Sequence, residues 1–320
     1  MNPSHNIKRS MPDIVRATSP VWLKKKVRAS LHQRGFCQPH ERPPVDLRNI
    51  LTEPKDASAR CKDTPFLLNI PLAKCRAIRS LAFPCADDTT NPFIIALNQY
   101  QKTGDQQQAE IILRRYYEAL QPATAGELLG VSGTTPGGAF ALSPLCYDYP
   151  WDGEPRETLL RHRKMYIVAE AVGHGAKESF QGWHHFGPLH RDRIKLEAER
   201  LVNVYHGISE QGYLRDDSKD GDIAGVALFS QGDYVVLITK GHHRIAALTS
   251  LGYDSVPVRF GLDRVSFVHR EHAARWLGVH RSGYTAEQAI EVFDRIFNGY
   301  QPAVCEDWNL ELSRLRRLLR

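Results

Sequence analysis

The chain has 320 residues, 42% of them hydrophobic, and a formal net charge of +6. It is therefore long enough to bury a full core and to form two domains. No apolar run approaches the roughly 20 residues that cross a membrane, so we expect no transmembrane segment. The N-terminus lacks the apolar stretch of a secretory signal, so we expect no such signal.

The positive charge is concentrated near the N-terminus. Residues 1–60 hold 12 Lys and Arg against 5 Asp and Glu, which leaves 30 against 31 for the rest of the chain. A protein that grips long stretches of nucleic acid needs a basic face on its folded domain. If the chain contacts nucleic acid or anionic lipid, we expect the contact only through the basic arm, which includes residues 24–28. A solvated tail or a docking segment is the preferred interpretation of this arm.

The cysteines are scattered and contain no Cys-x-x-Cys pair. This pattern predicts free thiols in the reducing environment of the cytoplasm, rather than disulfides or a zinc site. The six are Cys37, Cys61, Cys75, Cys85, Cys146 and Cys305.

In chain order, residues 1–65 are rich in proline and predict an extended arm, with one short helix over residues 22–31. Residues 66–131 predict a helical subdomain. Asn91 before Pro92 marks one helix start, Asp105 precedes a stripe of apolar residues at helical spacing, and Thr124 and Glu127 have the spacing of a capping box.

Residues 132–185 predict a linker followed by a loop region rich in aromatic residues and histidine. The adjacent His184 and His185 would point apart on a strand, and no cysteine or carboxylate spacing completes a zinc set. A loop that places aromatic and imidazole groups over a pocket mouth is the preferred interpretation. Ordinary surface or core histidines are the alternative.

Residues 191–211 predict a helix with one broad apolar face. Glu197 and Glu199 lie two residues apart, so their side chains project about 200° from each other and only one can face a ligand. An acidic loop follows over residues 216–222. Its last member, Asp222, is nearest the next strand and is a candidate Mg²⁺ ligand, with a solvated turn as the alternative.

The most informative segment is residues 232–260. Tyr234 to Thr239 is a short β-branched run that predicts a buried strand, and Ile245 begins a pattern that suits a helix up to Gly252. Gly241 lies at the tight turn between the two. The first helical turn offers unpaired N–H groups, so this is a site for an anion.

Four side chains surround that positive helix end: Lys240, His242, His243 and Arg244. Arg244 can hold a phosphate through two parallel hydrogen bonds. A second strand, residues 255–260, follows the helix.

These residues resemble the signature of the ParB/sulfiredoxin superfamily. The matching features are Gly-His-His-Arg over residues 241–244, Leu-Gly-Tyr over 251–253 and Val-Pro-Val over 256–258. The resemblance extends over about 75 residues, from residue 195 to the end of the second strand. It implies an α+β protein with a small mixed-sheet α/β domain that binds the phosphates of a nucleotide at this turn.

The resemblance also implies roles for particular residues. Members of the superfamily include CTP-dependent partition proteins, ATP-using sulfinic acid reductases and small-molecule kinases. The resemblance implies ATP, ADP or CTP with Mg²⁺ as the cofactor and residues 240–244 as the cofactor-binding turn. Likeness to the kinases favours Glu197 as the catalytic base. His243 is the second candidate catalytic residue, and Asp222 remains the candidate metal ligand. A solvent-side glutamate paired with Arg193 or Arg200 is the alternative for Glu197.

Two departures narrow the choice among the superfamily's activities. Lys240 stands where the kinases carry aspartate, and His242 stands where sulfiredoxin carries its catalytic cysteine, which excludes thiol reductase chemistry by that route. A partition protein also needs a helix-turn-helix domain after the nucleotide domain. The 60 residues after residue 260 predict a capped helix from Thr285 and a basic tail instead.

Two functions remain as expectations. The first is a nucleotide-dependent phosphotransferase that acts on a small hydroxylated metabolite such as an amino acid or sugar. The second is a non-catalytic nucleotide-binding, ParB-like protein that binds DNA or another partner. The expected domains are an arm over 1–65, a helical subdomain over 66–131, a linker and histidine region over 132–185, a ParB/sulfiredoxin-like domain over 186–300 and a tail over 301–320, with a homo-oligomer as one expected state.

Overall fold

A computed structural model describes residues 43–318, apart from 63, 87–88, 132–137, 155, 177–180, 216–220 and 264. Residues Pro44–Arg320 form one compact unit. The boundaries expected at residues 131, 185 and 300 fall inside this unit. The basic cluster at residues 24–28 and the short helix expected over 22–31 lie outside the described residues.

The strands form one mixed sheet in the order β1-β2-β7-β5-β6-β3-β4, with β8 also paired to β5. The pairs β2–β7, β5–β6 and β3–β4 are antiparallel, whereas β1–β2, β3–β6, β5–β7 and β5–β8 are parallel. This mixture of strands and helices confirms the α+β class. The strands are β1 Val45–Asp46, β2 Phe66–Pro71, β3 Cys75–Ala77, β4 Phe83–Pro84, β5 Ala224–Ser230, β6 Asp233–Lys240, β7 Ser255–Phe260 and β8 Phe267–His269.

The helical pattern expected from residue 66 is wrong for the first part of that range. Phe66–Pro71 is strand β2, and two further strands, β3 and β4, precede the first helix of the range at Pro92. An apolar run as short as that of β2 fits a buried strand or a buried helix equally well by periodicity. Pairing decides between them, because β2 lies between β1 and β7 in the sheet.

Helix starts follow the local signals. The Asn91 side chain accepts from the Phe93 amide at 3.0 Å, which confirms the expected cap of α4. Thr285 and Gln288 form the expected capping box of α11. The helices are α3 Pro54–Cys61, α4 Pro92–Thr103, α5 Gln106–Ala119, α6 Ala125–Leu129, α7 Arg156–Gly173, α8 Arg191–Gln211, α9 His242–Ser250, α10 Leu277–Arg281, α11 Ala286–Asn298 and α12 Glu306–Leu318.

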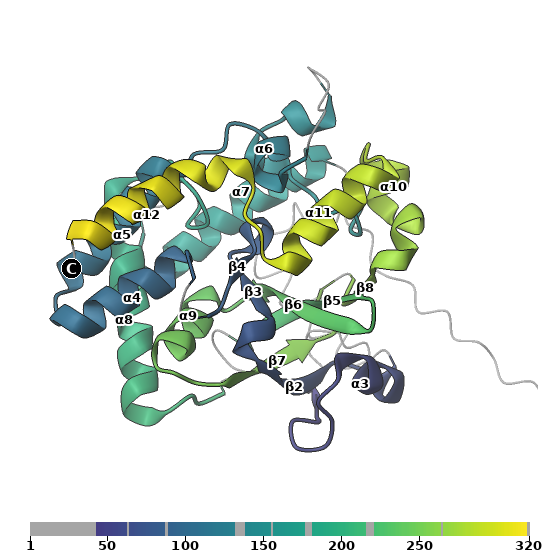
Figure 1. Ribbon diagram of the computed structural model, residues 1–320, viewed down its shortest axis with the longest axis horizontal. Coiled ribbons are helices and arrows are strands. Elements are labelled where there is room, and N and C mark those ends of the chain that lie inside the picture. Colours follow the sequence, from purple (N-terminus) through teal and green to yellow (C-terminus); the bar gives the residue numbers. More distant parts are fainter. Residues whose placement is uncertain are drawn as a thin grey trace, which may run out of the picture. The chain divides into compact units, whose positions relative to one another are not determined.

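Helices α4, α5, α8 and α9 pack against one another beside the sheet, and α12 lies along α5 (Figure 1). Helix α8 contacts α9, the helix that follows strand β6. This packing brings the middle of α8 next to the β6–α9 turn. The region between residues 151 and 190, expected as a loop, contains helix α7, which the sequence analysis did not predict.

Candidate functional site

The β6–α9 turn is built as the sequence predicts. Strand β6 ends at Lys240, helix α9 begins at His242, and Gly241 between them has φ 92° and ψ 31°. A side chain is strained in this left-handed region. A Cβ on Gly241 would also lie 2.8 Å from Ile223 Cγ1 and 3.2 Å from an Arg244 nitrogen. Glycine is therefore required for both backbone conformation and space.

A cavity of about 390 Å³ lies over this turn. All five residues of the expected cofactor-binding turn line it: Lys240, Gly241, His242, His243 and Arg244. Its other walls come from α7, α8, the loop before α8 and the segment after β3. They include Arg79, Tyr166, Glu170, His174, His184, His185 and Arg200. The expectation that His184 and His185 line a pocket is confirmed.

His242 is fixed by a backbone contact. The Ile78 N–H donates to its Nδ1 at 3.2 Å, and the imidazole is 6% exposed. Because Nδ1 accepts, the neutral ring carries its hydrogen on Nε2. Burial, together with the charge of Arg79, holds the pKa of His242 well below its usual value.

Arg244 and Lys240 both reach toward Gly221. Arg244 donates to the Gly221 carbonyl at 2.6 Å, and Lys240 Nζ would lie 2.8 Å from a Cβ built on that glycine. Both cations line the cavity. Together with the amides of the first turn of α9, they give this end of the cavity a positive potential.

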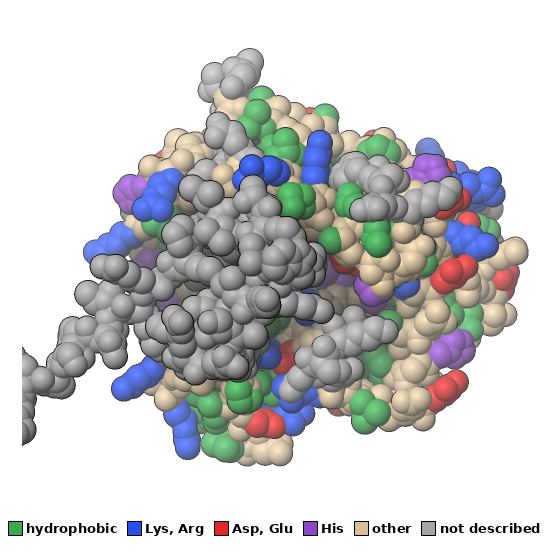
Figure 2. Space-filling model, turned by 180° about the vertical axis from the view of Figure 1, so that it is seen from behind, with side chains coloured by type: hydrophobic (Ala, Val, Ile, Leu, Met, Phe, Trp, Pro, Cys, Tyr) green, Lys and Arg blue, Asp and Glu red, His purple; other side chains and the backbone are tan. Residues whose placement is uncertain are grey.

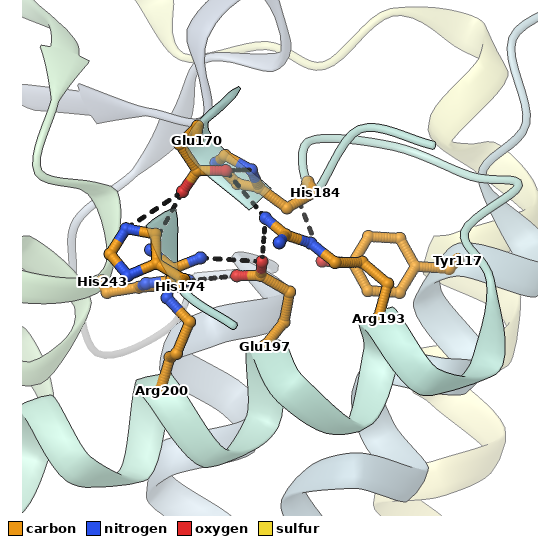
Figure 3. Close-up of polar contacts among 8 residues, drawn as sticks. All are labelled: Tyr117, Glu170, His174, His184, Arg193, Glu197, Arg200 and His243. Atoms are coloured by element: carbon orange, nitrogen blue, oxygen red, sulfur yellow. Dashed lines mark hydrogen bonds and ion pairs between the residues drawn. The ribbon is translucent and has the colours of Figure 1, made fainter. Parts of the chain in front are cut away.

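Glu197 lies at the centre of a buried charge network (Figure 3). Its carboxylate is 2.6 Å from Arg193, 2.9 Å from Arg200 and 3.1 Å from His243 Nε2. The side chain is fully buried. The pairing with Arg193 and Arg200 expected in the alternative is present, but the expected solvent-side position is wrong, because the side chain is buried.

This network contradicts the role of catalytic base for Glu197. Burial on its own would raise its pKa, but His184, His243 and Arg200 outweigh that effect and hold the pKa well below the usual range. A carboxylate with such a low pKa accepts a proton poorly. The arrangement instead makes Glu197 a positioning residue, which orients His243 at the cavity wall.

Glu170 of α7 completes the network from the opposite side (Figure 3). It lies 2.7 Å from Arg193 and 3.0 Å from Arg200. Burial lowers the pKa of the neighbouring His184 to about 4, against the opposing charges of Glu197 and Glu170.

Glu170, His184 and Glu197 offer ligand atoms within 4.8 Å of one another, so they have the composition of a metal site. The two carboxylates are already neutralised by Arg193 and Arg200 at 2.6–3.0 Å. A divalent cation would have to displace these guanidinium groups from a buried position. The residues fit a charge network better than a metal centre.

Asp222 does not have the expected magnesium role. It is 2% exposed, its Oδ1 lies 2.6 Å from Arg215 and its Oδ2 lies 3.3 Å from Arg259. Two cations thus occupy the oxygens that a Mg²⁺ would need, and Asp222 is absent from the cavity wall. The rest of the acidic loop, residues 216–220, lies outside the described residues.

No family model, curated protein or solved structure matches this chain. Its function therefore has to be argued from the cavity itself. Within the described residues, no helix is both long enough and apolar enough to cross a membrane. The five cysteines of the described part form no disulfide with one another.

The cavity residues that the sequence analysis missed include Glu170 and Arg79. Glu170 lies on α7. The buried residues Leu159, Ile167 and Ala171 are spaced by multiples of four, and this apolar spacing in the sequence could have predicted the helix. Arg79 had no local signal. It reaches the cavity because β3, just before it, pairs with β6, just before the turn.

Proposed function

We propose that the cavity over the β6–α9 turn binds the phosphates of a nucleotide, within a ParB/sulfiredoxin-like domain. The supporting observation is that Lys240, Gly241 and Arg244 line one cavity with the amide end of α9. Backbone N–H groups at a helix N-terminus and flanking cations are the standard means of binding phosphate. A volume of about 390 Å³ lies within the range of small-molecule sites.

The reaction we propose is phosphoryl transfer to a small hydroxylated metabolite such as an amino acid or sugar. The bond between phosphorus and the nucleotide's leaving oxygen breaks, and one to the acceptor's hydroxyl oxygen forms. His243 would take the hydroxyl proton on Nδ1, because its Nε2 faces Glu197. Positioning and charge stabilisation would supply most of the catalysis.

The described residues do not fit a Mg²⁺ held by the protein. Asp222 and Glu197 are paired with arginines, and Glu170 contacts two of them. We therefore derive no step through a protein-bound metal ion.

The test is turnover of ATP, ADP or CTP with pools of amino-acid and sugar acceptors, followed by phosphorus NMR of the products. We expect a phosphorylated acceptor, and we expect Arg244→Gln to abolish it. The matched control is Arg314→Gln, since Arg314 is 67% exposed on α12. No turnover with any pair of nucleotide and acceptor would refute the reaction. Unchanged nucleotide binding by the Arg244 variant would refute the site.

A second candidate is a nucleotide-binding protein without phosphoryl transfer, which binds DNA or another partner. The ion pairs of Glu197 and Asp222 with arginines favour this candidate, because they occupy the carboxylates that a base and a Mg²⁺ site would need. The DNA version finds less support, because the Lys and Arg side chains visible on the face in Figure 2 are scattered among other residue types rather than forming a continuous basic surface. Nucleotide binding by calorimetry without turnover would select this candidate.

A further inference from the structure

Three further side chains of the cavity wall form a group of their own: Arg79, His185 and His242. The His185 and His242 rings lie 4.9 Å apart between centroids. The Trp183 ring lies 4.2 Å from His185 and also carries the Arg79 guanidinium over its face at 5.7 Å. The three polar groups are therefore close neighbours.

An unfavourable backbone conformation holds Arg79 at this place. Ile78 has φ 57° and ψ 46°, and Arg79 has φ 51°. The left-handed region is rare for a β-branched residue, and such conformations cluster at ligand sites. The hydrogen bond from the Ile78 amide to His242 ties this turn to the first residue of α9.

Four polar atoms of the group lack partners among the described residues. Arg79 Nε, His242 Nε2 and both ring nitrogens of His185 are buried and have no hydrogen-bond partner within the described part of the chain. His185 and His242 are 3% and 6% exposed. Buried polar groups are nearly always paired in folded proteins. Since His242 Nε2 and Arg79 are donors, the missing partner is an acceptor.

We propose that Arg79, His185 and His242 bind a carboxylate of the acceptor metabolite, whose phosphate ester would lie at the β6–α9 turn after phosphoryl transfer from the nucleotide. One guanidinium and two neutral imidazoles match the single negative charge of a carboxylate, whereas a phosphate dianion suits the turn with Lys240 and Arg244. The substrate class is then small hydroxy acids and their phosphate esters. This inference rests on the proposed phosphate site.

Two further observations agree with this assignment. Burial, with the charges of neighbouring histidines and Arg79, holds the pKa values of His185 and His242 well below the usual range, so both rings are neutral donors near pH 7. Arg79 and Arg244 line the same cavity, and His242 lies two residues before Arg244 in α9. The two subsites are therefore close enough for a short ligand.

The test is calorimetric binding of 3-phosphoglycerate and of glycerol 3-phosphate to the full chain at pH 7.5. At the end away from the phosphate, 3-phosphoglycerate carries a carboxylate and glycerol 3-phosphate carries a hydroxymethyl group. We expect 3-phosphoglycerate to bind about 10- to 100-fold more tightly, the usual effect of a charge-assisted hydrogen-bond pair. Equal affinities of the wild-type protein for the two probes would overturn the carboxylate site, and this comparison needs no variant.

Variants separate the two subsites. Arg79→Gln should remove the preference for 3-phosphoglycerate and leave glycerol 3-phosphate binding unchanged, whereas Arg244→Gln should weaken both. Arg79→Lys, which keeps the charge, should retain part of the preference, and Arg314→Gln should change nothing. If Arg79→Gln preserves the preference, the carboxylate assignment is wrong while the phosphate site stands. If neither probe binds the wild-type protein, the phosphate site and this inference both fail.

Discussion

Acidification should destabilise the protein strongly between pH 7 and pH 5, because three histidines are buried as neutral rings. The pKa of His184 is lowered to about 4 by burial, and burial also holds the pKa values of His185 and His242 well below the usual value. In the unfolded chain a histidine has a pKa of about 6.5. A lowered folded pKa stabilises the fold above the unfolded pKa, and this contribution is lost as the pH falls toward the folded value.

The expected magnitude follows from proton uptake by the unfolded chain. Each histidine that protonates only when unfolded costs about 2 kcal/mol of stability between pH 7 and pH 5, so three cost about 6 kcal/mol. Typical domains are stable by only about 5–15 kcal/mol. Without ligand, the protein should therefore lose a large part of its free energy of unfolding by pH 5.

Urea denaturation at pH 7, 6 and 5, followed by circular dichroism, measures this loss. His185→Gln should reduce the loss by about one third, or about 2 kcal/mol. The matched control is His280→Gln, an exposed position on α10, which should leave the loss unchanged. Equal free energies of unfolding at pH 7 and pH 5, or a His185 variant that loses as much as the wild type, would refute this account of the buried rings.

Three further changes test the charge network, the β6–α9 turn and the β5–β6 hairpin. Glu197→Gln should destabilise by about 3–5 kcal/mol because it leaves buried arginines undercompensated, whereas Glu199→Gln, at a side chain 40% exposed, should change urea stability by less than about 0.5 kcal/mol. Gly241→Ala should cost more than Gly252→Ala in thermal melts, since both have positive φ but only the former would place a Cβ against Ile223; equal costs would contradict the close approach. Gln231→Asn should raise the free energy of unfolding by about 0.5 kcal/mol, because this residue, with φ 51°, opens a two-residue hairpin turn that favours Asn-Gly; a loss of stability would contradict that assignment.

Local signals predicted local structure well. Strand β6, helix α9 and strand β7 follow from a change of hydrophobic period within 30 residues, and the turn glycine follows from the sharp reversal between them. The extent of α8, Arg191–Gln211, also agrees with its pattern. These elements are determined mainly by residues close together in the chain, so the spacing of apolar residues and glycines is enough to predict them.

Long-range placement could not be predicted in the same way. Asp222 reads as a loop carboxylate in the sequence, but Arg259 of the distant strand β7 lies beside it in the structure. Glu197 reads as a residue on a half-exposed helix, but α7 brings Glu170 against the same arginines and buries the whole group. The chemistry of each carboxylate is set by partners that no local pattern reveals.

The pairing of β2 with β7 has a consequence for biosynthesis. Phe66 is opposite Phe260, so the antiparallel neighbour of β2 emerges from the ribosome about 190 residues after it. Until then, the apolar edge of β2 remains open, and open strand edges invite aggregation. Fragments that end before residue 255 should therefore collect in the insoluble fraction, and production of the chain in cells should benefit from slow synthesis and from chaperones.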